Sequence, residues 1–194
     1  LMTNQFKKEK HIRLHLITKA QDSSQINILA FYDVRRLGTF EWKNFAELEQ
    51  KMGIEPLSSK FSPTMLQQLL KNTHQPIKSF LLNQKKIAGI GNIYASEALF
   101  RSQIHPLRNA ASLTLSEIEK LANNIQAVLF QAIENQGTSI HDFMFGNGNG
   151  QEGNFQHFLQ VYGKHSQPCP ICGTPIQRIK INGRSSFFCP SCPH

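Results

Sequence analysis

The first forty residues alternate apolar and polar positions in the manner of half-buried β-strands. The alternation is regular over residues 12–16, and a second apolar run covers residues 26–32 after a polar turn. A third short strand is predicted over residues 38–42. Three short strands do not bury one another in water, so we expect this segment to be an incomplete part of a larger β domain that begins upstream.

From Ser62 onward the apolar spacing is helical. Ser62 offers a capping hydroxyl just before a proline, which suits the first turn of a helix, and a second short helix is predicted over residues 77–82. Thr114 and Glu117 form a capping-box sequence ahead of apolar positions that keep helical spacing until Gly137. The middle of the chain is therefore predicted to be a helical domain with one long core helix.

Residues 146–153 are too rich in glycine and polar side chains to pack into a core. We expect a mobile loop there. Two interpretations stay open, a disordered connector and a functional lid.

The cysteines of the chain lie in two Cys-x-x-Cys pairs near its end, and they are Cys169, Cys172, Cys189 and Cys192. Two such pairs at this spacing are typical of a zinc site. Four thiolates fill a tetrahedral shell and leave no open position, so one zinc ion would support the fold and take no part in chemistry. The alternative is a pair of disulfides in a secreted domain, which the lack of an apolar signal stretch disfavours.

Between the cysteine pairs the sequence predicts a β-ribbon. Asn182 and Gly183 suit the positive φ angles of a two-residue hairpin turn, and β-branched and aromatic residues flank them. Arg184 follows the turn directly. We therefore expect its guanidinium at the tip of a ribbon that the metal holds in place.

The charge of the chain favours a polyanionic partner. Lys and Arg total 21 against 13 Asp and Glu, which gives a formal net charge of +8. Such an excess attracts phosphate backbones, although many basic chains are simply soluble basic proteins. No apolar run is long enough to cross a bilayer, so we expect no membrane association and a cytoplasmic protein.

A glycine-rich turn before a predicted helix provides a candidate phosphate site. Gly89 and Gly91 allow close approach of the backbone, and Asn92 stands at the expected helix start, where free N–H groups carry the positive end of the helix dipole. The plainer interpretation is that Asn92 only caps the helix and the glycines only form a turn.

Several of these segments together resemble the formamidopyrimidine-DNA glycosylase and endonuclease VIII family, from about Tyr32 to the C-terminus. The segments that carry the resemblance are Asp33-Val-Arg-Arg-Leu-Gly38, Ile87-Ala-Gly-Ile-Gly-Asn-Ile-Tyr-Ala-Ser-Glu-Ala-Leu-Phe100, Ile104-His-Pro106, Phe155-Gln156, Leu159-Gln-Val-Tyr-Gly163 and the four-cysteine ribbon with Gly183-Arg184. The chain is more similar to the formamidopyrimidine-DNA glycosylase branch, which excises oxidised purines.

The resemblance implies an α+β multidomain fold. Residues 1–45 would be residual strands of an incomplete N-terminal β-sandwich, and residues 46–145 a helix–two-turn–helix domain that binds DNA. Residues 146–166 would be a lesion-loop region and linker, and residues 167–194 a zinc-finger β-ribbon. The implied partner is double-stranded DNA with an oxidised purine or an abasic site and one nucleotide flipped out of the stack. We expect a monomer.

The resemblance also implies roles for six residues. Asn92 and Arg184 would grip the phosphates that flank the flipped nucleotide, and Lys78 would lie near the damaged base. The remaining three would meet the duplex and the base left unpaired, and they are Arg35, Arg36 and Leu37. Leu37 departs from the family's pattern, which has a phenylalanine wedge there. The plainer interpretation of Arg35 is a surface ion pair.

The family's chemistry uses an N-terminal proline as the nucleophile and a glutamate beside it for proton transfer. The chain opens Leu1-Met2-Thr3 and its first proline is Pro56, so neither catalytic residue is present in it. An internal proline nitrogen is an amide and cannot attack. No catalytic residue is therefore assigned, and we expect an N-terminal fragment to be missing.

Three functional hypotheses follow. The first is a truncated glycosylase and AP lyase that binds damaged DNA but lacks the catalytic start. The second is a non-catalytic, zinc-dependent DNA-binding protein. The third keeps residual lyase activity through a surrogate amine, because a well-placed lysine or N-terminal amine can attack an open-ring abasic aldehyde.

Overall fold

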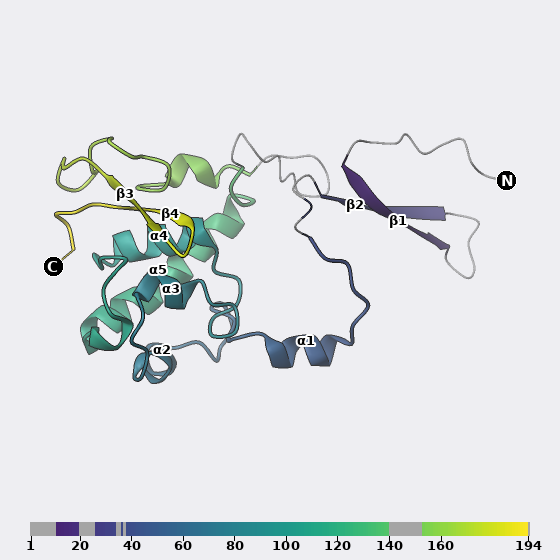
Figure 1. The fold of residues 1–194 in the computed structure, drawn as a ribbon, viewed down its shortest axis with the longest axis horizontal. Coiled ribbons are helices and arrows are strands. Elements are labelled where there is room, and N and C mark those ends of the chain that lie inside the picture. Colours follow the sequence, from purple (N-terminus) through teal and green to yellow (C-terminus); the bar gives the residue numbers. More distant parts are fainter. Residues whose placement is uncertain (1–10, 20–25, 34–35, 37, 140–152, 194) are drawn as a thin grey trace. The chain divides into compact units, whose positions relative to one another are not determined.

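The computed structural model describes residues 11–19, 26–33, 36, 38–139 and 153–193. The chain divides into two compact units, Leu1–Asn44 and Phe45–His194. The first holds a pair of strands, and the second holds the helices and a second pair of strands (Figure 1). This composition confirms the predicted α+β class, while the domain boundaries expected at residues 45, 145 and 166 stay predictions. None of the helices in the described residues is long and apolar enough to span a membrane.

The first unit contains the two predicted strands, and they pair as an antiparallel hairpin. β1 (Ile12–Lys19) pairs with β2 (Ile26–Tyr32), with Leu16 opposite Leu29 and a bulge between Ile12 and Leu14. Large apolar side chains remain exposed on this hairpin, including Leu29 at 64%. The exposure agrees with the expectation that two strands alone do not bury their apolar residues.

The prediction of a third strand over residues 38–42 is wrong. The described residues 38–44 form no strand. Instead, the N–H of Gly38 donates to Asp33 Oδ2 at 2.8 Å, and the ring of Phe40 packs against that of Phe31 at 6.0 Å. A side-chain hydrogen bond and aromatic packing are thus found where the alternating pattern suggested a strand.

The second unit has its core between four helices. These are α2 (Pro63–Leu70), α3 (Ile77–Leu81), α4 (Asn92–Arg101) and α5 (Leu115–Glu134). α5 packs against α2 and α4, and α3 packs against α4. The predicted helices are all present. A further helix, α1 (Phe45–Lys51), was not predicted.

The predicted capping signals form at both helix starts. Ser62 Oγ accepts from the N–H of Met65 at 3.1 Å, and Pro63 occupies the first turn of α2. Thr114 Oγ1 accepts from Glu117 N at 3.3 Å, while Glu117 Oε2 accepts from Thr114 N at 2.7 Å, which completes the capping box of α5. Each such cap stabilises a helix by about 1 kcal/mol.

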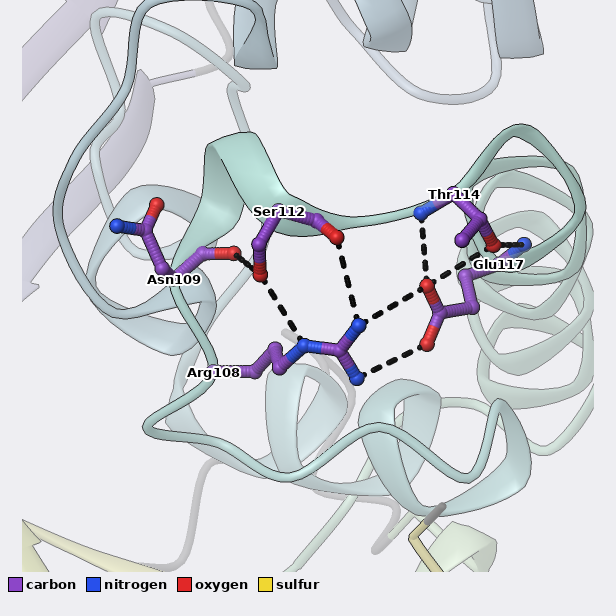
Figure 2. A network of polar contacts seen from close by, with 5 residues as sticks. All are labelled: Arg108, Asn109, Ser112, Thr114 and Glu117. Carbon is purple, nitrogen blue, oxygen red and sulfur yellow. Dashed lines mark hydrogen bonds and ion pairs between the residues drawn. The ribbon is translucent and has the colours of Figure 1, made fainter.

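Arg108 ties this capping box to the preceding loop (Figure 2). Its guanidinium forms an ion pair with Glu117 at 3.1 Å and donates from Nε to Ser112 Oγ at 3.1 Å. Partial burial would raise the pKa of Glu117, but hydrogen bonds from Thr114 and the charge of Arg108 outweigh it and lower that pKa. The carboxylate therefore stays ionised where it caps the helix.

The second strand pair is the predicted ribbon. β3 (Gln177–Ile181) and β4 (Arg184–Phe188) are antiparallel, with Ile181 opposite Arg184. β4 packs on α4, so the ribbon lies over this helix (Figure 1). α4 thus contacts α3, α5 and the ribbon.

Candidate nucleic-acid interface and zinc centre

The four cysteines form a site that fits a tetrahedral metal. Their sulfur atoms all lie within 4.8 Å of one another. Cys172 Sγ is 3.4 Å from Cys189 Sγ and 3.5 Å from Cys192 Sγ, and Cys169 Sγ is 3.6 Å from Cys192 Sγ. Four thiolates about 2.3 Å from one zinc ion would lie roughly 3.8 Å apart. A disulfide needs about 2.05 Å, so the disulfide interpretation does not fit.

The backbone around the cysteines suits thiolates. The N–H groups two residues after Cys169 and Cys189 each donate to the preceding sulfur at 3.4 Å. Such donors stabilise negative charge on sulfur and orient it. The donor set, the spacing and these N–H groups all fit a structural zinc ion with no open coordination position.

The ribbon shares a small core with α4. Phe100 from α4 and Val161 from the linker are buried with Ile176, Phe187 and three of the cysteines. Outside this core, the ring of His105 meets that of Phe188 edge-on at 4.5 Å. The ribbon is therefore packed against the helices over a hydrophobic surface, which fixes the position of its turn.

The turn of the ribbon exposes Arg184. Asn182 and Gly183 have φ angles of 49° and 74°, as a two-residue hairpin turn requires. Arg184 follows at the start of β4 with its side chain exposed. The backbone of the turn thus places Arg184 at the tip of the ribbon, as predicted.

The start of α4 is open and carries no side-chain cap. Gly91 is the N-cap residue, and Gly89 has a φ of 80°. A Cβ atom at either glycine would meet nothing within 4 Å. Asn92 is the first residue of the helix, and no cap residue's side chain bonds its first N–H groups. The plainer interpretation of Asn92 as the cap is therefore wrong, and the positive helix end has no side-chain cap.

Asn92 connects this helix start to the ribbon. Its Nδ2 donates to Ser185 O at 2.9 Å and lies 3.5 Å from the hydroxyl of Tyr162. Its Oδ1 is buried and has no partner among the described residues. Since Ser185 directly follows Arg184, the bond brings two predicted phosphate-binding residues, Asn92 and Arg184, to the same edge of the unit.

Lys78 lies beneath this edge, in the interior. Its side chain has no exposed surface, and Nζ donates to Ser96 Oγ at 2.7 Å. Ser96 Oγ in turn donates to Asn92 O at 3.0 Å. Burial, and after it the charge of Arg184, lower the pKa of Lys78 to about 7. The structure thus places the predicted lysine near Asn92 and Arg184, but not on the surface.

The residues predicted to enter the duplex belong to the other unit. Arg36 is exposed and has a φ of 57°. Arg35 and Leu37 lie outside the described residues, as does the glycine-rich loop apart from Gly153. Their roles stay predictions.

Sequence reasoning missed Glu97. Its carboxylate is fully buried in α4 and accepts three backbone hydrogen bonds from the linker before the ribbon. The available signal was a charged residue directly before the apolar residues Ala98 and Leu99 in a predicted core helix, since an acidic residue is rarely buried unless something compensates its charge.

Two family models match the second unit. The formamidopyrimidine-DNA glycosylase H2TH domain matches residues 52–144, and the zinc finger found in FPG and IleRS matches residues 166–192. The second match supports the assignment of one structural zinc ion to the four cysteines.

Relatives cover nearly the whole chain. A formamidopyrimidine-DNA glycosylase of Lactobacillus helveticus is 39% identical over 197 residues, which cover 99% of this chain and 69% of that protein. The chain belongs to the formamidopyrimidine-DNA glycosylase family. The family member of Pelotomaculum thermopropionicum is 42% identical over 183 residues, 92% of this chain and 64% of its own length. The chain thus spans about two thirds of the curated relatives that it matches.

Solved structures of the family agree with the fold. The MutM (FPG) protein of Thermus thermophilus has a TM-score of 0.84 at 36% identity and matches 96% of this chain and 70% of its own. The Lactococcus lactis Fpg in complex with abasic-site DNA has a TM-score of 0.84 at 34% identity, over 99% of this chain and 69% of its own. A mutant of the same protein with Fapy-dG DNA gives 0.85 at 34% identity, with the same coverage.

Proposed function

We propose that this chain grips the phosphate backbone of damaged duplex DNA between the start of α4 and the tip of the zinc ribbon. The observation that carries this proposal is the 2.9 Å hydrogen bond from Asn92 Nδ2 to Ser185 O. It holds an uncapped, positive helix end beside the exposed guanidinium of Arg184. Both groups can bind phosphate oxygens. The helix start offers backbone N–H donors, and the guanidinium of Arg184 offers paired, permanently charged donors.

The wider role that we infer is base excision repair of oxidised purines. The relatives carry the name formamidopyrimidine-DNA glycosylase, and two Lactococcus lactis structures hold Fapy-dG DNA or abasic-site DNA. We infer a monomer that acts on such duplexes in the bacterial cytoplasm, where four thiols stay reduced for zinc. A net charge of +8 would speed its encounter with DNA.

Replacing Arg184 with alanine tests the phosphate grip. We expect the affinity for a duplex with a stable abasic-site analogue to fall by about 10- to 100-fold, because a charge-assisted hydrogen bond is worth about 1.5–3 kcal/mol. The slope of log affinity against log salt should fall by about one, since one phosphate contact is lost. Fluorescence anisotropy over a salt series measures both quantities.

Arg178→Ala is the matched control, because Arg178 is exposed on β3 of the same ribbon but lies away from the turn. It removes the same charge and should change affinity by less than about threefold. Equal effects of the two substitutions would show that only net charge matters and would refute a specific grip at the ribbon tip.

Borohydride trapping tests the surrogate-amine hypothesis. Lys78 has a pKa of about 7, so much of its amine is unprotonated at neutral pH, yet its side chain has no exposed surface. We therefore expect no covalent adduct between Lys78 and an abasic duplex after borohydride reduction, even where binding is retained. A cross-linked peptide that contains Lys78 would contradict this expectation and indicate lyase chemistry from within α3.

A further inference from the structure

Glu97 is a buried carboxylate that binds backbone instead of a basic side chain. Its Oε1 accepts from the N–H groups of Val161 at 3.0 Å and Tyr162 at 2.9 Å, and its Oε2 accepts from Gln160 at 2.9 Å. Within the described part of the chain it forms no ion pair with lysine or arginine. A buried charge is tolerated only when several good hydrogen bonds replace its water, and three charge-assisted bonds do so here.

The three N–H groups belong to the linker that leads into the ribbon. The side chain of Val161 is buried in the core that α4 shares with the ribbon. The ring of Tyr162 meets Phe187 of β4 at 5.0 Å, and its hydroxyl lies 3.5 Å from Asn92 Nδ2. The segment that Glu97 holds therefore contacts both sides of the proposed grip.

Glu97 and Asn92 lie on the same short helix, five residues apart. Glu97 fixes the linker to α4, the linker positions β4 through Tyr162 and Phe187, and β4 begins with Arg184. A carboxylate suits this task because it accepts hydrogen bonds with both oxygens and donates none. A glutamine would turn an N–H₂ group toward at least one backbone N–H, and an aspartate would be one methylene too short.

We propose that Glu97 is a positioning residue that sets the separation between Asn92 and Arg184, so that two phosphates of the damaged strand are met by a preorganised pair of donors. This role rests on the phosphate grip proposed above, and Glu97 is the residue that maintains the geometry of that grip. Glu97 itself touches no DNA. Glu97 should therefore affect DNA affinity only by positioning Arg184 and Asn92. Its effect on affinity should vanish when Arg184 has already been replaced.

The test is a double-mutant cycle on the zinc-loaded chain, with a duplex that carries a stable abasic-site analogue. Glu97→Gln alone should weaken binding by about tenfold or more and lower the salt slope, because the guanidinium no longer reaches its phosphate. In the Arg184→Ala background the same substitution should change affinity by less than about twofold. Glu97→Asp keeps the charge but has a shorter side chain, and its DNA affinity should lie between those of the wild type and Glu97→Gln.

Ser102→Ala is the control for general loss of stability. Ser102 is buried just after α4, and its hydroxyl bonds to Ala98 O at 2.7 Å and to residues of α5, on the helical side of the unit. Ser102→Ala should lower the unfolding midpoint of the protein without changing the salt slope of DNA binding. If Glu97→Gln does not fold, Glu97→Asp serves as the folded variant. Effects of Glu97→Gln or Glu97→Asp that add to those of Arg184→Ala would overturn the positioning role. Wild-type affinity in Arg184→Ala would instead overturn the phosphate grip itself.

Discussion

Replacing Cys189 with serine is expected to release zinc, unfold the ribbon and reduce DNA affinity to the non-specific level. Zinc contributes about 10–16 kcal/mol to the folding of small four-ligand domains at neutral pH, which exceeds what the ribbon's few buried side chains can supply. The ribbon core consists mainly of Phe100, Val161, Ile176 and Phe187 together with the cysteines. Without the metal, Arg184 and Ser185 lose the position that makes the proposed grip.

The helical core should survive this substitution. Its buried side chains come mainly from α2 to α5 and form a separate cluster from those around the cysteines. Far-ultraviolet circular dichroism should therefore keep most of its helical signal, while a colorimetric zinc assay reads no bound metal. Ser191→Ala, an exposed change in the same Cys-x-x-Cys turn, is the matched control and should retain zinc. Wild-type DNA affinity in Cys189→Ser would rule the ribbon out as a contact element.

Replacing Lys78 with methionine is expected to stabilise the protein, and more strongly at low pH than at high pH. Burial and the charge of Arg184 lower the pKa of Lys78 from 10.5 to about 7. In the unfolded chain this amine keeps its proton up to its ordinary pKa, so unfolding between pH 7 and 10.5 takes up a proton. Stability of the wild type therefore rises with pH across this window, and below pH 7 the cost of burying the charge is complete.

The size of the effect follows from the linkage. One unit of pKa corresponds to about 1.4 kcal/mol, so the advantage of Lys78→Met should be on the order of 3 kcal/mol greater at pH 6 than at pH 9. The lost bond to Ser96 offsets about 1 kcal/mol of this advantage at either pH. Urea unfolding at the two pH values measures the difference.

Lys85→Met is the control for this experiment, because it makes the same substitution at an exposed position. If the difference in unfolding free energy between Lys78→Met and the wild type stays constant with pH, the buried amine is not the titrating group. If Lys78 also serves DNA, as the sequence predicts, Lys78→Met should bind the abasic duplex more weakly while it is more stable.

Local signals in the sequence predicted local structure well. The capping box of Thr114 and Glu117, the hairpin turn of Asn182 and Gly183, and the paired cysteines each depend on residues within a few positions of one another. Their physical causes, a capping hydroxyl, a positive φ angle and a metal-ligand spacing, operate over the same short range. The sequence therefore sufficed for these features.

The site itself depends on contacts that no local pattern contains. Glu97 binds a segment 63 to 65 residues further along the chain, and Asn92 binds Ser185 at a separation of 93 residues. The burial of Lys78 likewise results from packing against α4, not from its neighbours in sequence. The error at residues 38–42 has the same origin, because an alternating pattern does not reveal whether a partner strand is available.

The core that α4 shares with the ribbon bears on how this metal site could be moved or copied. Phe100 and Val161 both lie outside the stretch that contains the four cysteines, yet they cover the same buried side chains. The apolar side chains of the ribbon are thus covered jointly by the helix and the linker. A cysteine ribbon grafted alone onto another scaffold would leave Phe187 and Ile176 facing water, and a transplant that keeps them covered would have to carry α4 with it.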